Sequence, residues 1–246
     1  MNTATILLLH SLAMSGELWR PLTGKLEPRA RVVAMDARGH GESTWDGSPF
    51  TVEDLADDAA ALLDELGDGP YAVAGMSMGG CVAVALAGRR PELVNRLVLA
   101  DTTADYGPDK AQAWAQRAEN AVAKPRDKQL ELQLDRWFSP DFLEREPAEA
   151  KRVADLFLAT DSRAHAAACR ALGAFDGTAL LPAIAADTLV VVGEHDYATP
   201  PAMAEALADG IPGAELRVFA GARHLSLFES PGALDLVAAH LLGEDR

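Results

Sequence analysis

Cysteine and long apolar runs are scarce in this 246-residue chain, and each shortage excludes a class of protein. Cys81 and Cys169 are the only cysteines and lack CxxC spacing, which argues against a Cys-rich zinc or iron–sulfur site. We expect two small buried thiols in a reduced, cytoplasmic setting. The apolar run 6–9 is too short to span a membrane and follows no basic segment, so we expect neither membrane association nor a signal peptide.

Basic residues are also few. The chain has 22 Lys and Arg against 37 Asp and Glu, a formal net charge of −15, which argues against nucleic acid as a partner. Half of the basic residues, 11, lie between positions 102 and 186, where they nearly balance 13 acidic ones. The acidic excess of the remaining chain indicates a solvated, soluble surface. The expected partner is a small-molecule substrate, and the residues indicate no particular oligomeric state.

Short apolar runs alternate with helical patterns along much of the chain. Most runs lack the alternation of a half-exposed strand, which is typical of strands buried on both faces of a parallel sheet. We therefore predict an α/β fold with a mostly parallel sheet of about six strands and flanking helices. The predicted strands are Thr5–Leu9, Val32–Asp36, Tyr71–Gly75, Leu97–Asp101, Leu189–Gly193 and Leu216–Ala220. The predicted helices between them are Thr51–Leu66, capped by Thr51, and Met78–Arg90, Pro201–Asp209 and Pro231–Leu242.

The alternation stops between positions 102 and 186. That segment contains helical patterns, among them Lys110–Lys124, Ala148–Thr160 and Arg163–Ala174, and no convincing strand. It is too long for an ordinary connection between two strands. We interpret residues 102–186 as a helical cap inserted into a core formed by residues 1–101 and 187–246.

Residues 75–79 form a G-x-S-x-G pentapeptide centred on Ser77. The pentapeptide alone is a weak signal, but here it follows an apolar strand and opens a helix, which is the context of a nucleophile elbow. Such a turn needs small flanking residues and presents the serine oxygen at the carboxyl end of the sheet. Ser77 is therefore the candidate nucleophile.

A serine nucleophile needs a base and an acid that orients the base. His224 follows the last predicted strand, and Asp196 follows the strand before it, so all three side chains would lie at the carboxyl edge of the sheet. Asp101 is a rival acid after an earlier strand, and we favour Asp196. His240 is expected on the surface of the terminal helix, and His165 is expected to have a packing or solvated role.

An oxyanion hole requires two backbone N–H groups that point at the developing charge. One should come from Met78, the residue after the nucleophile. The other should come from the loop after the first strand, where Ser11 and Leu12 are the candidates. His10 in this loop is expected to orient the loop rather than to transfer protons. These residues require neither a metal nor an organic cofactor.

Together these residues resemble the α/β-hydrolase superfamily over nearly the whole chain. The closest resemblance is to the 3-oxoadipate enol-lactonases, through residues 10–12, 75–80 and 196–201 and the cap stretch 136–140. The resemblance places the family triad on Ser77, Asp196 and His224. The family normally begins with a β-hairpin, whereas four residues precede Thr5 here, so six strands are expected rather than eight. Ala13 stands where lactonases tend to have glycine.

The predicted activity is hydrolysis of a small lactone or carboxylic ester, with 3-oxoadipate enol-lactone as a candidate substrate. A carboxylesterase or perhydrolase, a C–C hydrolase or lyase, and a non-catalytic binding protein on the same fold remain open. Arg136, Trp137 and Phe138 are the predicted substrate-binding residues, and Trp114 and Met203 are further candidates to line the acyl pocket. Arg136, Arg163 and Arg170 are the candidates to bind a substrate carboxylate, with a surface ion pair as the alternative for each.

Overall fold

A single six-stranded sheet forms the centre of the protein, as a computed structural model that describes residues 4–67 and 69–244 shows. All paired strands run parallel in the order β2-β1-β3-β4-β5-β6. The strands are β1 Thr5–Leu9, β2 Arg31–Met35, β3 Tyr71–Met76, β4 Val94–Ala100, β5 Asp187–Gly193 and β6 Glu215–Phe219. The six predicted strands and the α/β class are therefore confirmed.

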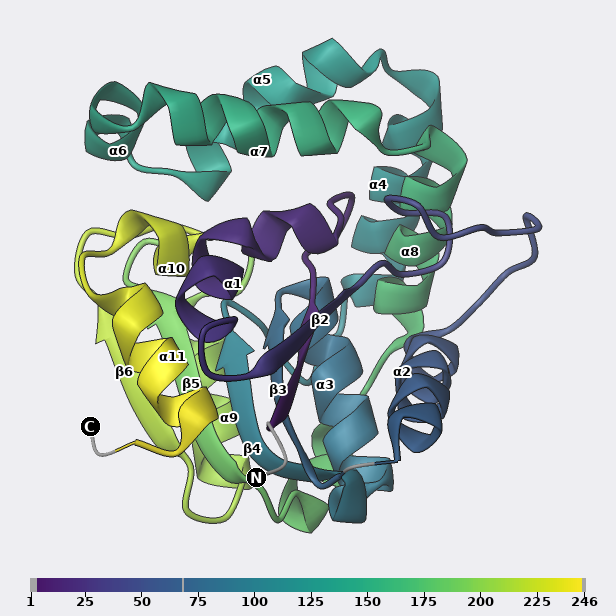
Figure 1. Ribbon diagram of the computed structural model, residues 1–246. Coiled ribbons are helices and arrows are strands. Elements are labelled where there is room, and N and C mark those ends of the chain that lie inside the picture. Colours follow the sequence, from purple (N-terminus) through teal and green to yellow (C-terminus); the bar gives the residue numbers. More distant parts are fainter. Residues whose placement is uncertain (1–3, 68, 245–246) are drawn as a thin grey trace.

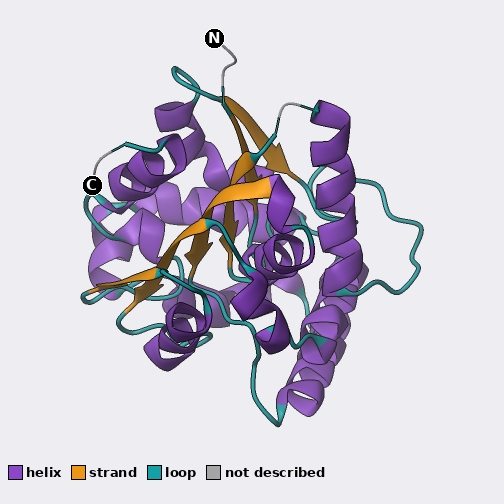
Figure 2. Ribbon diagram, turned by 90° about the horizontal axis from the view of Figure 1, so that it is seen from below, coloured by secondary structure: helices purple, strands orange, loops and turns teal. Residues whose placement is uncertain are grey.

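Helices cover both faces of the sheet (Figure 2). The helices α1 (Arg20–Leu26) and α11 (Ala233–Leu242) contact each other on one face. The helices α2 (Val52–Leu66), α3 (Met78–Arg89) and α9 (Pro201–Gly210) cover the other. Double coverage explains why the central strands β1 and β3 are buried along their whole length, whereas the edge strands β2 and β6 are partly exposed.

Local signals explain where several of these helices begin. The Thr51 side chain accepts a hydrogen bond from the Asp54 N–H at 3.0 Å, and the Asp54 carboxylate accepts one from the Thr51 N–H at 2.8 Å. This reciprocal capping box starts α2 at the predicted place. The terminal helix begins later than predicted, at Ala233, because Gly232 has a φ of 76° and interrupts the chain after Pro231.

Between β4 and β5 the described residues form helices, turns and loops but no strand, apart from one isolated bridge between Asp105 and Asp176. The five α-helices here are α4 Lys110–Ala123, α5 Arg126–Trp137, α6 Pro140–Arg145, α7 Pro147–Ala159 and α8 Ser162–Ala174. A short 3-10 helix, Thr178–Ala183, precedes β5. In Figure 1, α5, α6 and α7 lie above one end of the sheet, and α4 and α8 lie side by side and connect them to the core.

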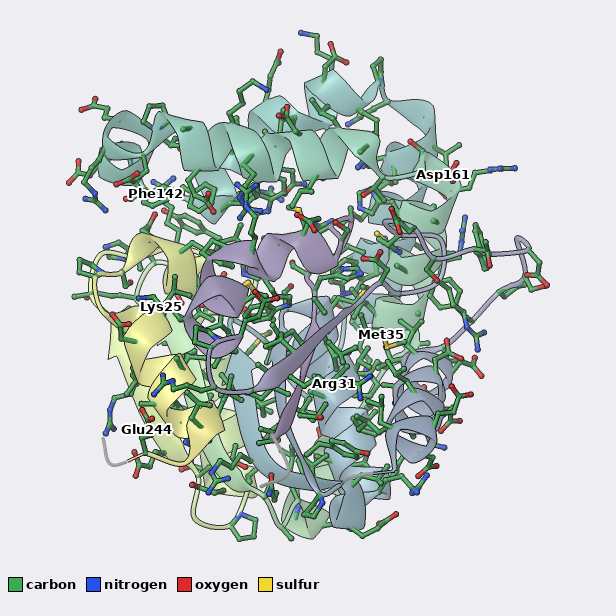
Figure 3. The ribbon with its side chains drawn as sticks, in the orientation of Figure 1. Lys25, Arg31, Met35, Phe142, Asp161 and Glu244 are labelled. Carbon is green, nitrogen blue, oxygen red and sulfur yellow. The ribbon has the colours of Figure 1, made fainter. Side chains whose placement is uncertain are left out.

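The side-chain view identifies which end of the sheet these helices cover. Arg31 and Met35 mark the two ends of β2, and Met35 lies at the end nearer to α8 (Figure 3). Because the sheet is parallel, the carboxyl ends of all strands face the inserted helices. Phe142 of α6 is buried, on the side of that helix that faces the core (Figure 3).

Three smaller elements complete the fold, the 3-10 helices Gly16–Trp19 and Pro91–Leu93 and the short helix α10, Ser226–Glu229. Within the described ranges, no helix combines the length and the apolar character needed to cross a membrane. Cys81 and Cys169 are both buried and unpaired with each other, as expected.

The surface position predicted for His240 is wrong. Its ring is buried, and Nε2 lies 3.2 Å from the Leu97 carbonyl oxygen and 3.0 Å from that of Asp187. The imidazole therefore joins α11 to the sheet.

Candidate active site

The turn that carries Ser77 is a strained connection between β3 and α3. Ser77 has a φ of 52° and a ψ of −114°, a conformation that residues other than glycine rarely adopt. Its N–H donates to the Ala100 carbonyl at 2.9 Å, and the Thr102 hydroxyl donates to the Ser77 carbonyl at 2.7 Å. These bonds to the end of β4 and the residues after it hold the turn in place.

The two glycines of the pentapeptide are required by close backbone contacts. A Cβ atom on Gly75 would lie 2.2 Å from the Gly79 carbonyl oxygen. A Cβ atom on Gly79 would lie 2.1 Å from the carbonyl oxygen of Leu9. Neither contact is tolerable for a larger residue, so the glycines allow strand, turn and helix to approach this closely.

A continuous chain of hydrogen bonds joins Ser77, His224 and Asp196. The Ser77 Oγ lies 3.0 Å from His224 Nε2, and His224 Nδ1 lies 2.8 Å from an Asp196 carboxylate oxygen. A carboxylate only accepts, so Nδ1 carries the proton and Nε2 is free to accept the serine hydroxyl proton. All three side chains are buried. The structure thus brings together the three residues that the sequence singled out after β3, β5 and β6.

Asp196 is held rigidly by its own loop. One oxygen accepts the N–H groups of Ala198 and Thr199 at 2.7 and 3.0 Å, and the other accepts the Thr199 hydroxyl at 2.8 Å. Burial opposes ionisation of this carboxyl, but the charge and hydrogen bond of His224 and the Thr199 donors hold its pKa below the ordinary value. The ionised form is therefore favoured beside the imidazole.

The rival acid, Asp101, has different partners. It accepts hydrogen bonds from the Gly193 N–H at 3.0 Å and from the N–H and hydroxyl of Ser226 at 3.0 and 2.9 Å. Burial and the nearby Asp196 charge raise the pKa of Asp101 well above its ordinary value. Asp101 therefore supports the loops that follow β5 and β6 instead of contacting His224.

The loop that carries His224 is tied directly to the inserted helices. The N–H groups of His224 and Leu225 donate to the carbonyls of Arg136 and Trp137 at 3.3 and 3.0 Å. The buried Glu229 carboxylate accepts the N–H of Arg223 at 2.7 Å and the N–H of Ser139. The carboxyl end of α5 and the His224 loop are thus one hydrogen-bonded unit.

A cavity of about 460 Å³ opens above Ser77, and we call it the Ser77 cavity. It lies between the loops at the carboxyl end of the sheet and the inserted helices. Its lining residues are Ser11, Leu12, Ser77, Tyr106, Trp114, Arg117, Gln133, Asp135, Arg136, Trp137, Phe157, His165, Tyr197, Ala198 and His224. This volume suits a small organic molecule.

Several backbone N–H groups near Ser77 remain available to a ligand. Within residues 4–67 and 69–244, no acceptor takes the N–H of Met78, Ser11 or Leu12. Ser11 and Leu12 also line the Ser77 cavity. Ala13, the next residue, has a φ of 57°, which accounts for the glycine that the resemblance leads us to expect there.

His10 has both ring nitrogens engaged by the backbone. Nδ1 donates to the Ser11 carbonyl at 2.8 Å, and Nε2 accepts the Ala37 N–H at 3.0 Å. Burial lowers the pKa of this ring, so the neutral form is favoured. These contacts match the orienting role expected for His10 in the loop.

Not every residue expected around the substrate lies at the Ser77 cavity. Arg136, Trp137 and Trp114 do, but Phe138 does not, because it is completely buried and stacked on Phe142 with ring centroids 4.5 Å apart. Met203 is not among the lining residues either. The candidates Arg163 and Arg170 line a separate cavity beside Trp45 and Phe50.

Other cavity residues were missed by the sequence analysis. Tyr106, Arg117, Gln133 and His165 all reach the Ser77 cavity from the inserted segment. Helical periodicity could have grouped Trp114 with Arg117 on one face of α4, but nothing in the sequence indicates which face meets the sheet. No group of three or more metal-ligating side chains suited to an ion lies in the part of the chain that the structure describes.

A sequence profile of the α/β hydrolase fold matches residues 4–231. The chain belongs to the α/β-hydrolase family. Over 226 residues it is 30% identical to 3-oxoadipate enol-lactonase 2 of Acinetobacter baylyi, and the aligned region covers 92% of this chain and 84% of that protein.

Solved structures of α/β hydrolases agree with the assignment. The enol-lactonase from Burkholderia xenovorans LB400 superposes with a TM-score of 0.92 at 34% identity, covering 99% of this chain and 93% of that one. A thermophilic esterase from Thermogutta terrifontis superposes with a TM-score of 0.87 at 30% identity, covering 96% and 87%. The predicted resemblance to the α/β hydrolases, with enol-lactonases among the similar proteins, is therefore confirmed.

Proposed function

We propose that this α/β hydrolase cleaves a small lactone or carboxylic ester through Ser77, His224 and Asp196. The observation that carries the proposal is the continuous hydrogen-bond chain from the Ser77 hydroxyl to the Asp196 carboxylate at the floor of the Ser77 cavity. The strained turn at Ser77 adds support, because such strain persists where the surrounding structure enforces it and is common at active sites.

In the first step, His224 Nε2 removes the Ser77 hydroxyl proton as Oγ attacks the substrate carbonyl. The carbonyl π electrons move to oxygen, and the resulting oxyanion accepts the N–H of Met78 and the N–H of Ser11 or Leu12. The imidazolium then gives its proton to the departing alkoxide or enolate, which leaves an acyl-enzyme. Asp196 stabilises the imidazolium without taking its proton.

Water completes the cycle by the same chemistry. His224 removes a proton from water, the hydroxide attacks the acyl carbonyl, and Ser77 Oγ leaves with the proton returned by His224. For a lactone, the leaving oxygen stays attached to the acyl chain, so one ring-opened acid is released. Besides the substrate and water, these steps use only groups of the chain.

The substrate we favour is an enol-lactone of the 3-oxoadipate type. Several similar proteins carry the name enol-lactonase, and their matches cover nearly the whole chain, so they extend over the segment 102–186. We propose that this segment is a cap over the remaining core and contributes Arg136 and Trp137 to substrate binding. Both residues line the Ser77 cavity.

A substrate panel tests the proposal. We expect the wild-type protein to hydrolyse 3-oxoadipate enol-lactone with a higher kcat/KM than saturated lactones or p-nitrophenyl esters. Ser77→Ala and His224→Ala should each lose at least about 10⁴-fold in kcat, because residues that act as a unit fail together. Full activity in Ser77→Ala would contradict the mechanism.

A carboxylesterase is the second candidate, because the similar Thermogutta terrifontis protein is an esterase. The same panel separates the two functions. Preference for an unstrained p-nitrophenyl ester over every lactone would favour the esterase and would leave the roles of Ser77, His224 and Asp196 unchanged.

A further inference from the structure

Arg117 of α4 places a guanidinium in the wall of the Ser77 cavity, where no carboxylate of the described residues pairs with it. Its Nε is buried and makes no hydrogen bond, and its terminal nitrogens have no hydrogen-bond or ion-pair partner in the described part of the chain. Other arginines of the inserted segment differ from it. Arg152, for example, pairs with Glu149 and also donates to the carbonyls of Glu17 and Leu18.

A guanidinium without an ion-pair partner in this position is unfavourable for folding. Burial lowers the pKa of Arg117, but a guanidinium remains protonated in proteins, so its charge persists. The groups that affect its pKa are the Cys169 thiol, the Tyr106 hydroxyl and the Arg136 cation, and none of them is a carboxylate. A buried charge normally has a partner. An anionic ligand would supply the partner that Arg117 lacks.

The surroundings orient the guanidinium for such a ligand. Its carbon lies 4.9 Å from the centroid of the Trp114 ring, which in turn packs edge-on against Tyr106 with centroids 4.9 Å apart. One face of the guanidinium is thus covered by an aromatic ring. The donors along its edge remain available, and they match the two oxygens of a carboxylate.

The rest of the cavity wall reinforces the positive potential. Arg136 lines the same cavity, whereas the lining carboxylate of Asp135 is already engaged by Arg223, with Nη1 2.8 Å from Oδ1. His165 also lines the cavity, and burial together with Arg117 and Arg126 lowers its pKa to about 2, so it stays neutral and adds no charge to the cavity wall.

We propose that Arg117 binds a carboxylate of the substrate, so that the preferred substrates are lactones or esters whose acyl part carries a free carboxylate. This inference rests on the proposed function, because the same cavity contains Ser77. It assigns the anion contact to α4, with Arg136 as a more exposed second cation. Arg163 and Arg170, in the separate cavity, take no part.

Two matched esters test the assignment. The p-nitrophenyl monoester of adipic acid carries a terminal carboxylate, and p-nitrophenyl 6-methylheptanoate replaces that carboxylate with an isopropyl group of equal size. We expect Arg117→Gln to lower kcat/KM for the anionic ester by about 10- to 100-fold, the usual range for a charge-assisted hydrogen bond. The neutral ester should change less than about threefold, and Arg117→Lys should restore part of the preference.

The control is Arg31→Gln, which removes an exposed arginine at the amino-terminal end of β2, away from the cavity, and should leave both rates unchanged (Figure 3). Equal losses on both esters in Arg117→Gln, or a selective loss only in Arg136→Gln, would overturn the assignment.

A binding measurement separates this inference from the proposed function. In the Ser77→Ala protein, calorimetry with adipate at constant ionic strength should detect binding that Arg117→Gln weakens at least about tenfold. This readout needs no turnover, so a protein that hydrolyses neither ester but binds adipate through Arg117 would contradict only the proposed function. Hydrolysis without any dependence on Arg117 would contradict only the anion contact.

Discussion

At the scale of single residues, the position of Ser77 follows from glycine sterics that the sequence already encodes. Gly75 and Gly79 each face a backbone oxygen that would lie within 2.2 Å of an added Cβ. A G-x-S-x-G between an apolar strand and a helix therefore predicts the turn almost completely. Arg117 could not be predicted in this way. Its proposed role requires that no carboxylate pairs with it, and the packing of α4 against its neighbours decides which side chains lie nearby.

Asparagine substitutions distinguish Asp196 from Asp101 as the acid that orients His224. Asp196→Asn keeps the shape of the side chain but removes the charge and favours the wrong His224 tautomer, so kcat should fall by about 10³- to 10⁴-fold with a small change in Tm. Asp101→Asn should mainly lower Tm, because an amide cannot accept from all the donors of Gly193 and Ser226, and kcat should fall less than about tenfold. Steady-state kinetics and thermal melts measure both.

The reverse pattern would move the acid role to Asp101. Thr199→Val tests the contribution of the hydroxyl that donates to Asp196 at 2.8 Å. It should cause an intermediate loss of kcat, because one of the hydrogen bonds that orient the carboxylate disappears.

At the scale of elements, the inserted helices and the His224 loop form one unit through α5. The sequence analysis did not single out α5, because Leu130, Leu132 and Leu134 alternate with polar residues, a pattern that does not indicate a helix. The ends of the helices α4, α7 and α8 were each predicted to within one residue, since each helix repeats alanine or larger apolar residues on one face. The link between α5 and His224 consists of backbone hydrogen bonds, which leave no trace in a sequence.

The Glu229 side chain joins α5 to the His224 loop, so its substitution should weaken the contact between them. Its two oxygens serve two N–H donors, those of Ser139 and Arg223. In Glu229→Gln the amide nitrogen would face one of these donors. We expect Tm to fall, with a loss of about 1–3 kcal/mol in the free energy of unfolding for one buried donor left unsatisfied. We also expect kcat to fall about tenfold, because His224 follows Arg223 directly.

Glu144→Gln is the control for this experiment, because Glu144 is an exposed residue of the neighbouring helix α6. It should match the wild type in thermal melts and in kcat. Unchanged stability and kcat in Glu229→Gln would show that the His224 loop does not depend on this carboxylate.

At the scale of the whole molecule, the parallel sheet was the most predictable feature. Each predicted strand is followed by a helix or a crossover, and parallel order follows from that alternation. His240 shows where such patterns end. It lies on the same helix as the buried Val237 and Leu241, and the nearby carbonyls of Leu97 and Asp187 help to make burial of a polar ring acceptable.

Buried histidines make the stability of the whole protein depend on pH. Burial lowers the pKa of His40 to about 3 and that of His165 to about 2, from 6.5. Between pH 6.5 and about 3 the unfolded chain binds protons that the folded protein does not. Stability is therefore retained above pH 6.5 and lost as the pH falls, by up to about 1.4 kcal/mol per pH unit for each ring.

Urea unfolding at pH 7 and pH 5 tests this dependence. The wild type should lose stability on acidification, and His165→Gln, whose amide oxygen can still accept from Arg126, should lose less. His195→Gln, at an exposed position, should behave as the wild type. A wild type equally stable at both values would contradict the neutral burial of His40 and His165.

The net charge of −15 also bears on how an anionic substrate could bind. Much of the acidic excess lies outside segment 102–186, and that segment contributes both cavity arginines, Arg117 and Arg136. A substrate anion is repelled by the molecule as a whole, so local cations would have to offset that repulsion within the Ser77 cavity. The nearly balanced segment is the part of the chain that can provide them.

Covalent labelling tests the assignment of Ser77 as the nucleophile: the protein is treated with a fluorophosphonate, its intact mass is measured, and the modified residue is located by peptide mapping. We expect one adduct per chain on Ser77, none in Ser77→Ala, and much slower labelling in His224→Ala, because the serine needs its base. An unmodified Ser77, or an adduct on any other residue that persists in Ser77→Ala, would contradict it.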